Sequence, residues 1–139
     1  MEQILTFALN HWALSGGLIL IIFFIVAEEI RNKKDGTKLS PQDATRLINT
    51  ENAVVIDLRE KTLYDNGHIV RAIHLAKSTL NDNLNKITKL KNKPIILVDT
   101  SDYQSGTIRQ KLHKEGFTRL FILAGGIHAW KEAGLPLVK

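Results

Sequence analysis

The sequence predicts an α/β domain with a mainly parallel sheet and helices on both faces, preceded by one N-terminal transmembrane helix. Two observations lead to this prediction. Residues 3–27 carry no charged side chain. From residue 40 onward, short β-branched apolar runs alternate with helical patterns, an order typical of parallel sheets. We therefore divide the chain into a membrane anchor (1–30), a juxtamembrane linker (31–39) and a folded domain (40–139).

The N-terminal segment has the length and composition of a membrane-spanning helix. A helix from Phe7 to Ala27 would be about 32 Å long, close to the thickness of the hydrocarbon core. A cleaved signal peptide is the alternative, and it requires a basic stretch before the apolar run. Here that stretch reads Met-Glu-Gln, without a Lys or Arg. We expect an uncleaved, single-pass anchor that contacts membrane lipid.

The charges around the apolar run predict its orientation. No Lys or Arg precedes it, whereas Arg31, Lys33, Lys34 and Lys38 follow it. Because positively charged flanks stay in the cytoplasm, we expect the N-terminus outside the inner (cytoplasmic) membrane and the domain in the cytoplasm. Each of these cations would add about 1 kcal/mol of attraction to anionic lipid.

Composition excludes several kinds of chemistry. The chain of 139 residues contains no Cys, which excludes disulfides, thiol catalysis and Cys-ligated metals. The net charge of +5 is mild, and the lysine run Lys86, Lys89, Lys91 and Lys93 lacks the aromatic and Arg residues of nucleic-acid patches. We interpret this run as a solvated surface. We expect no nucleic-acid partner, no metal and no cofactor.

The folded domain is expected to begin with a helix and a buried strand. Ser40 has the position of an N-cap, with Pro41 at the first helical position and Asp43 near the positive helix end. Residues 53–58 form a nearly continuous apolar run, typical of a strand that is covered on both faces. The domain therefore starts as helix, then strand.

The remaining elements continue this alternation. We expect a short strand at 73–75, a weak helix around residues 84–90, a buried strand at 95–98, a helix from Ser105, and a last strand at 118–124. Gly125 and Gly126 then permit a sharp turn into a final helix, in which Trp130 is expected to pack in the core.

Three stretches of the domain carry family motifs. The first is an Asp-x-Arg followed by an aromatic residue and Gly-His-Ile; the second is the polar loop after the strand at 95–98; the third is a Gly-Gly turn before a Trp-bearing helix. The residues of the first and third are Asp57, Arg59, Tyr64, Gly67, His68, Ile69, Ala72, Gly125, Gly126 and Trp130. Together they resemble a single-domain rhodanese, a sulfurtransferase-type fold, and the resemblance implies a structural role for these residues and a bacterial source. Val70-Arg71 stands where that family usually has Pro-Gly.

The second stretch departs from the family at the residues that perform its chemistry. The family loop reads Cys-x-x-Gly-x-Arg-Ser, and its Cys position falls on Asp99 in this chain. Gln104 stands at the Arg position, and only Ser105 matches. The family reaction requires a thiolate that accepts sulfane sulfur, so the resemblance implies the fold without the activity. We therefore predict no catalytic residue and no enzyme activity of this kind.

The resulting hypothesis is a membrane-anchored, non-catalytic rhodanese-like domain that acts as a binding or scaffold module at the cytoplasmic face. Its partner would be a protein whose identity the sequence leaves open, as it does the oligomeric state. In this hypothesis Asp99 places a carboxylate where the family holds an anionic sulfur, and it repels external anions. The candidate binding surface consists of Asp99, Thr100, Ser101, Asp102, Tyr103, Gln104 and Ser105, with Tyr103 as its exposed anchor.

Three alternatives remain open. In the first, the protein is a phosphatase-like hydrolase with Asp99 as nucleophile, although Ser101 stands where such enzymes have a second Asp. In the second, the hydroxyl of Ser101 or Ser105 is the nucleophile, activated by His68 or His128. In the third, the protein assists an active sulfurtransferase.

Overall fold

The computed structural model describes residues 1–34 and 36–139, without the side chains of residues 31–34. It divides the chain into two compact units, Met1–Gly36 and Thr37–Lys139. Each unit is described by itself. The predicted basic flank falls partly on the side chains of Arg31, Lys33 and Lys34, which lie outside what the structure describes.

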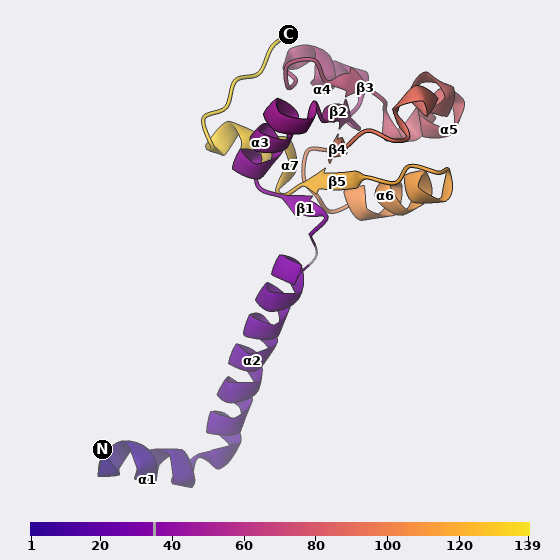
Figure 1. The fold of residues 1–139 in the computed structure, drawn as a ribbon. Coiled ribbons are helices and arrows are strands. Elements are labelled where there is room, and N and C mark those ends of the chain that lie inside the picture. Colours follow the sequence, from indigo (N-terminus) through magenta and orange to yellow (C-terminus); the bar gives the residue numbers. More distant parts are fainter. Residues whose placement is uncertain (35) are drawn as a thin grey trace. The chain divides into compact units, whose positions relative to one another are not determined.

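The first unit contains two helices, α1 (Glu2–Asn10) and α2 (Trp12–Lys34), shown in Figure 1. The prediction of one continuous helix from Phe7 to Ala27 was wrong, because His11 leaves the helical conformation, with φ −122° and ψ 42°. A 19-residue segment of α2, Trp12–Ile30, has a mean hydropathy of 2.2 and is not buried in the protein.

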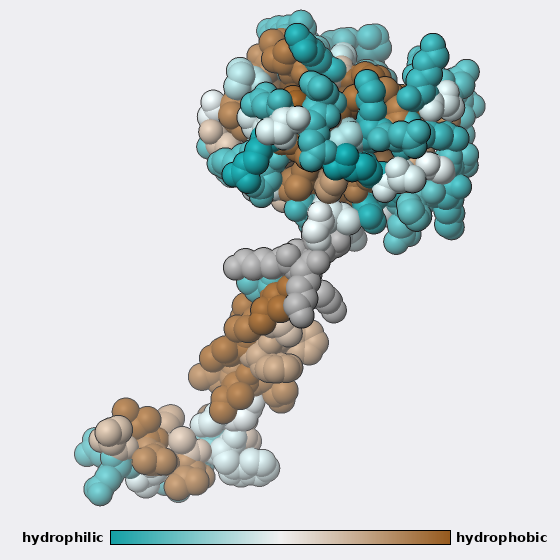
Figure 2. Space-filling view, in the orientation of Figure 1, coloured by the Kyte–Doolittle hydropathy of each residue, from teal (hydrophilic) through white to brown (hydrophobic). Residues whose placement is uncertain are grey.

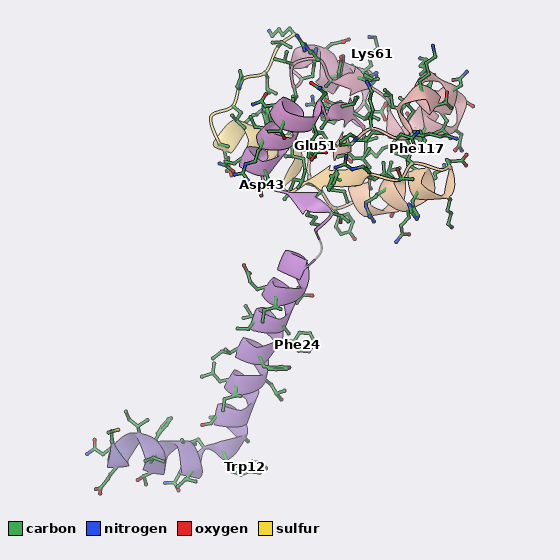
Figure 3. The ribbon with its side chains drawn as sticks, in the orientation of Figure 1. Trp12, Phe24, Asp43, Glu51, Lys61 and Phe117 are labelled. Carbon is green, nitrogen blue, oxygen red and sulfur yellow. The ribbon has the colours of Figure 1, made fainter. Side chains whose placement is uncertain are left out.

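Most side chains of α2 from Trp12 to Ile30 are apolar and exposed. Figure 2 shows apolar residues along this part of the helix, and in Figure 3 Trp12 and Phe24 project outward from it. These two side chains are 78% and 70% exposed. Exposed apolar surface of this size is unfavourable in water. By length and composition the helix is able to cross a membrane, and a signal sequence meets the same test.

The second unit is built on a five-stranded sheet in which every neighbouring pair is parallel, which confirms the predicted fold class. The strand order is β1-β5-β4-β2-β3. The strands are β1 (Lys38–Leu39), β2 (Val54–Asp57), β3 (Ile73–His74), β4 (Ile95–Val98) and β5 (Leu120–Leu123). Lys38 and Leu39 were expected in the linker, but they pair with β5. A strand of two residues is too short to leave a periodic pattern in the sequence.

Five helices and several 3₁₀ turns connect and cover the strands. They are α3 (Pro41–Glu51), α4 (Lys61–Asn66), α5 (Leu80–Asn83), α6 (Ser105–Lys114), α7 (Gly126–Glu132), and the turns η1 (Lys77–Thr79), η2 (Leu84–Lys86) and η3 (Thr88–Leu90). The predicted N-cap is confirmed, because the Asp43 N–H donates to Ser40 Oγ at 3.1 Å. The weak helix expected around residues 84–90 is instead a pair of 3₁₀ turns.

Two hydrophobic clusters cover the two faces of the sheet. Alternate residues of β4 enter different clusters: Ile96 and Val98 pack in the first, Ile95 and Leu97 in the second. The first cluster includes Trp130, which is 5% exposed and donates its indole N–H to Pro136 O at 3.1 Å. The core position predicted for this Trp is therefore confirmed. A strand that is buried on both faces has no polar side to display, which explains the unbroken apolar run in the sequence.

Parallel pairing brings two polar segments to one edge of the sheet. Asp57, the last residue of β2, is in register with Val98, the last residue of β4. Asp99 follows Val98 directly. Ligands of parallel α/β sheets bind at the carboxyl ends of the strands, so this edge is the candidate site.

Candidate functional site

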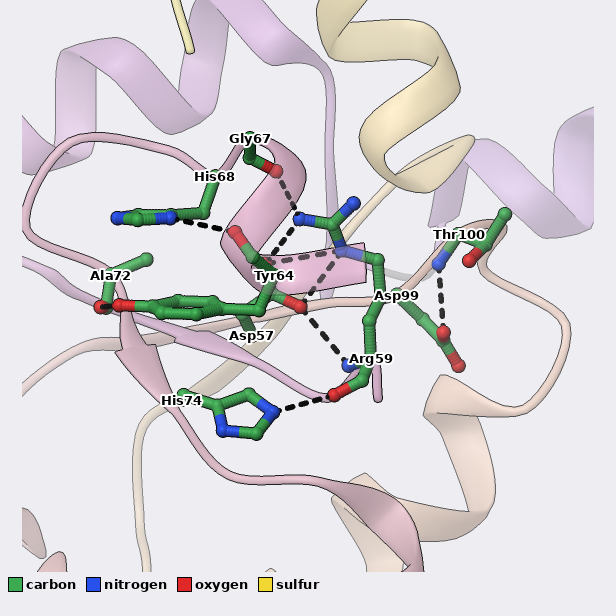
Figure 4. Close-up of polar contacts among 9 residues, drawn as sticks. All are labelled: Asp57, Arg59, Tyr64, Gly67, His68, Ala72, His74, Asp99 and Thr100. Carbon is green, nitrogen blue, oxygen red and sulfur yellow. Dashed lines mark hydrogen bonds and ion pairs between the residues drawn. The ribbon is translucent and has the colours of Figure 1, made fainter. Parts of the chain in front are cut away.

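Asp57 and Arg59 form a buried ion pair at the end of β2 (Figure 4). The Arg59 guanidinium donates from Nε to Asp57 Oδ1 at 3.0 Å and from Nη2 to Asp57 Oδ2 at 2.8 Å. Its Nη2 also donates to Gly67 O at 2.6 Å. The side chains are 1% and 5% exposed. This pair therefore connects β2 to the turn after α4, and its two charges compensate each other inside the protein.

Tyr64 and two histidines pack beside this pair. The Tyr64 hydroxyl donates to Ala72 O at 2.7 Å, and its ring stacks on His68 with centroids 3.9 Å apart. His74 Nε2 lies 2.8 Å from Arg59 O. Each of these side chains thus fixes a piece of backbone. Among the described residues, no three His, Asp or Glu side chains are placed to hold a metal ion.

Asp99 ends the central strand β4 and is 5% exposed. Its Oδ2 lies 2.6 Å from Lys77 Nζ, and its Oδ1 accepts the Thr100 N–H at 2.7 Å. Lys77 Nζ also donates to Gln104 Oε1 at 2.8 Å. Lys77 offsets the charge through which Asp99 is expected to repel anions, and the repulsion stays a prediction. Lys77 was not predicted as a partner of Asp99; its signal in the sequence is its position shortly after β3, at the same edge of the sheet.

Asp102 fixes the middle of the loop. Its Oδ2 accepts the Gly125 N–H at 3.2 Å and lies 3.5 Å from Lys38 Nζ, at the start of β1. The next residue, Gly126, passes so close to the loop that an added Cβ would collide with the carbonyl oxygens of Asp99 and Thr100. The Gly-Gly turn is therefore a requirement of the loop packing against α7.

The remaining loop residues divide into exposed and buried ones. Tyr103 is 90% exposed, and Thr100, Ser101 and Gln104 are exposed as well. Ser105 is fully buried at the first turn of α6, and its Oγ has no hydrogen-bond partner among the described residues. The loop therefore displays one large aromatic side chain, directly after the ion-paired Asp102.

The histidines proposed as bases for Ser101 or Ser105 are engaged elsewhere. His68 Nδ1 lies 2.9 Å from Tyr64 O. His128 Nε2 lies 3.1 Å from Glu132 Oε1 on the exposed side of α7. No hydrogen bond between described residues joins either histidine to Ser101 or Ser105.

The rhodanese-like domain family matches residues 40–133 of the chain. The chain belongs to this family. It is 35% identical to the uncharacterized protein YibN of Escherichia coli over 100% of this chain and 99% of YibN. It is 30% identical to the thiosulfate sulfurtransferase GlpE of Actinobacillus pleuropneumoniae, over 73% of this chain and 92% of GlpE.

Solved structures share the fold. A rhodanese-related protein from Thermoplasma volcanium superposes with a TM-score of 0.65 at 23% identity, over 73% of this chain and 96% of that protein. A polysulfide-sulfur transferase from Wolinella succinogenes gives a TM-score of 0.63 at 24% identity, over 83% and 87% of the two chains. This rhodanese-like chain has no Cys, so persulfide chemistry on its own side chains is excluded.

Proposed function

We propose that this protein is a non-catalytic, membrane-anchored binding module whose loop Asp99–Ser105 recognises a protein at the cytoplasmic face. One observation carries the proposal. The residue at the family's nucleophile position is a carboxylate that already binds Lys77 Nζ at 2.6 Å and the Thr100 N–H at 2.7 Å. Asp99 is thereby held in place at the start of the loop, and Lys77 neutralises its charge within the domain.

The same geometry argues against the phosphatase alternative. An attacking carboxylate needs a free oxygen that faces the substrate, and both oxygens of Asp99 have partners in a side chain that is 5% exposed. Aspartate phosphatases also use Mg²⁺ held by carboxylates, and the described residues provide no cluster of that kind. Asp99 is therefore a structural group of the loop.

The loop has the properties of a recognition surface. Ion pairs at Asp99 and Asp102 fix it at two points, so little conformational entropy is lost when a partner binds. Directly after Asp102, Tyr103 is 90% exposed, and an exposed Tyr offers a partner both an apolar ring and a hydroxyl. Tyr is also among the residues that contribute most to protein interfaces.

Membrane anchoring by Trp12–Ile30 completes the proposal. The similarity to YibN covers the whole chain, so it includes the apolar segment as well as the domain. The positive charges that follow the segment favour a cytoplasmic domain. The module would then meet its partner at the membrane.

Site-specific photo-crosslinking in native membranes tests the loop. The full chain carries p-benzoylphenylalanine either at Tyr103 or at Leu63, an apolar control residue on α4 that is 46% exposed. We expect one dominant protein adduct at Tyr103 that is absent at Leu63. Equal adducts at both positions, or none at Tyr103, would reject the loop as the recognition surface.

Two activity assays test the absence of catalysis. We expect no transfer of sulfur from thiosulfate to cyanide by the full chain, because it has no thiolate. We also expect no hydrolysis of a panel of phosphoesters. Hydrolysis that disappears in Asp99→Asn and persists in Asp65→Asn, an exposed control on α4, would establish the phosphatase alternative instead.

A further inference from the structure

The positive charge of the folded unit is concentrated on two segments. Residues 86–93 and 109–119 together carry eight Lys and Arg and a single acid, Glu115. The rest of residues 37–139 carries eight Lys and Arg and nine Asp and Glu. The whole positive excess of this unit therefore lies on the two segments, which are separated by β4 and the loop after it.

The fold brings these two segments together. The N–H and the hydroxyl of Thr118 both lie close to Lys91 O, at 3.4 and 3.3 Å. Lys91 Nζ lies 5.9 Å from the centre of the Phe117 ring. Ile87, Leu112 and Phe117 pack in one core cluster, so both segments cover the same face of the sheet. Their lysines form what we call the basic face: Lys86, Lys89, Lys91, Lys93, Lys111 and Lys114.

The basic face is not neutralised by the rest of the domain. None of its six lysines has a carboxylate oxygen within 4 Å among the described residues, and Lys86, Lys89, Lys93 and Lys114 are exposed. Lys38, Lys61 and Lys77 elsewhere each have such a partner. The arginines of the same two segments are engaged, Arg109 with Leu120 O and Arg119 with Glu51. Six ammonium groups without a carboxylate partner among the described residues are thus left for an external anionic surface.

We propose that the basic face binds the anionic headgroups of the membrane leaflet beside the anchor, an inference that rests on the membrane attachment in the proposed function. Each Lys near such a surface adds about 1 kcal/mol of attraction. A tether to the same membrane also keeps the lysines at high effective concentration near the headgroups. Flexible ammonium groups suit a fluid surface of phosphates better than a fixed ligand. Single-stranded nucleic acid would require stacking aromatics among the lysines, and Phe117 is buried.

Residues 86–93, interpreted from the sequence as a solvated surface, are then half of a lipid-binding face. Two charge runs that lie about 20 residues apart in the sequence become one face only in the fold. Binding through this face would set the side of the domain that faces lipid, and so the direction in which Tyr103 is presented.

The absence of Cys allows a clean test in the full chain. A single Asn92→Cys variant, labelled with an environment-sensitive fluorophore, places the probe between Lys91 and Lys93. A Thr62→Cys variant places it on α4, whose Tyr64 packs with the opposite core cluster. Both are incorporated into nanodiscs of phosphatidylcholine alone or mixed with phosphatidylglycerol. We expect a blue shift and an increase in fluorescence at Asn92 only with the anionic lipid.

High salt and charge-reversed variants test whether the fluorescence change at Asn92 is electrostatic. About 1 M salt shortens the Debye length to about 3 Å and should abolish the signal. The triple variant Lys86→Glu, Lys89→Glu and Lys93→Glu should also abolish it. The matched control Lys61→Glu, Lys131→Glu and Lys139→Glu has the same net charge and should keep it. Circular dichroism of both triple variants verifies that they are folded.

The outcomes separate the two proposals. A chain that does not enter neutral nanodiscs contradicts the anchor, and the headgroup proposal fails with it. A chain that enters them, but whose Asn92 probe is indifferent to phosphatidylglycerol, overturns the headgroup proposal alone. A probe that responds to added duplex RNA at physiological salt, and not to the anionic lipid, also overturns it and assigns the basic face to nucleic acid.

Discussion

Two ion pairs lie at the same edge of the sheet and differ in geometry, exposure and further partners. Asp57–Arg59 is a planar, bidentate pair with side chains 1% and 5% exposed. Asp99–Lys77 is a single-point contact in which the Lys side chain is 27% exposed. The first also binds the backbone of a neighbouring turn, and the second binds the exposed Gln104. One edge of the sheet therefore holds both a buried pair within the fold and a partly exposed pair that contacts a surface loop.

Removing one partner of the buried pair should have the largest effect. Arg59→Met leaves the Asp57 charge without its partner and Gly67 O without its donor. Loss of one member of a buried ion pair costs about 3–5 kcal/mol, so we expect the domain to be largely unfolded. Chemical denaturation followed by circular dichroism measures the change.

A second arginine provides the control for this prediction. Arg109 donates one hydrogen bond to Leu120 O and has no carboxylate partner among the described residues, so Arg109→Met should cost about 1 kcal/mol. Equal losses for the two variants would contradict the distinction between a buried pair and a single backbone contact.

Breaking the second pair should cost less. Asp99→Asn removes the charge that Lys77 neutralises but keeps an oxygen for the Thr100 N–H. A hydrogen bond that involves a charged group contributes about 1.5–3 kcal/mol, and the partly exposed Lys77 recovers some of this by turning to water. We expect a loss of about 1–2 kcal/mol in the free energy of unfolding, measured in urea.

The Asp99→Asn substitution should increase amide hydrogen exchange in the loop more than in the rest of the domain. Hydrogen exchange of the amides from Thr100 to Gln104 should accelerate in Asp99→Asn, while that of the amide of Arg59 stays unchanged. A loop whose exchange is unaffected would show that Asp102 and the Gly-Gly turn hold it without Lys77.

A third prediction concerns the backbone conformation of Arg71, with Arg46 as its control. Arg71 adopts a left-handed conformation with φ +63°, which costs a residue with a side chain about 1–2 kcal/mol. It is exposed and makes no hydrogen bond or ion pair in the described structure. Because the greater freedom of unfolded Gly offsets part of the gain, Arg71→Gly should stabilise the domain by about 0.5–1 kcal/mol. Arg46→Gly in the middle of α3 is the control and should destabilise it by about 1 kcal/mol.

The sequence predicts the layers of this fold well, because its strong periodic signals arise from burial. β4 and β5 are apolar on both faces since helices cover both, and the cap at Ser40 is a local interaction among neighbours. β1 was not predicted because a strand of two residues is too short to show a hydrophobic periodicity. The break at His11 was missed because no Gly or Pro marks it, and the apolar pattern continues across it.

The site was only partly predictable, for a different physical reason. Asp99 and the loss of the thiol follow directly from the motif alignment. Lys77 lies 22 residues away in the chain, and only the parallel pairing of β2 with β3 brings it to Asp99. The basic face likewise depends on the contact between Lys91 and Thr118. Interactions between residues distant in sequence are set by topology, which local patterns do not encode.

Tyr103 should show the smallest effect on stability and a decisive effect on binding. Its side chain is 90% exposed and takes part in no hydrogen bond in the described structure, so Tyr103→Ser should change the free energy of unfolding by less than about 0.5 kcal/mol. The same variant should lose the partner that crosslinking captures, since truncating an interface anchor costs about 2 kcal/mol or more. Pull-down of the crosslinked partner with a benzophenone at the neighbouring Ser101 measures that loss, and Leu63→Ser serves as the control. Arg59 would then be required for the fold and Tyr103 for recognition, whereas a Tyr103→Ser variant that keeps its partner would move recognition away from this loop.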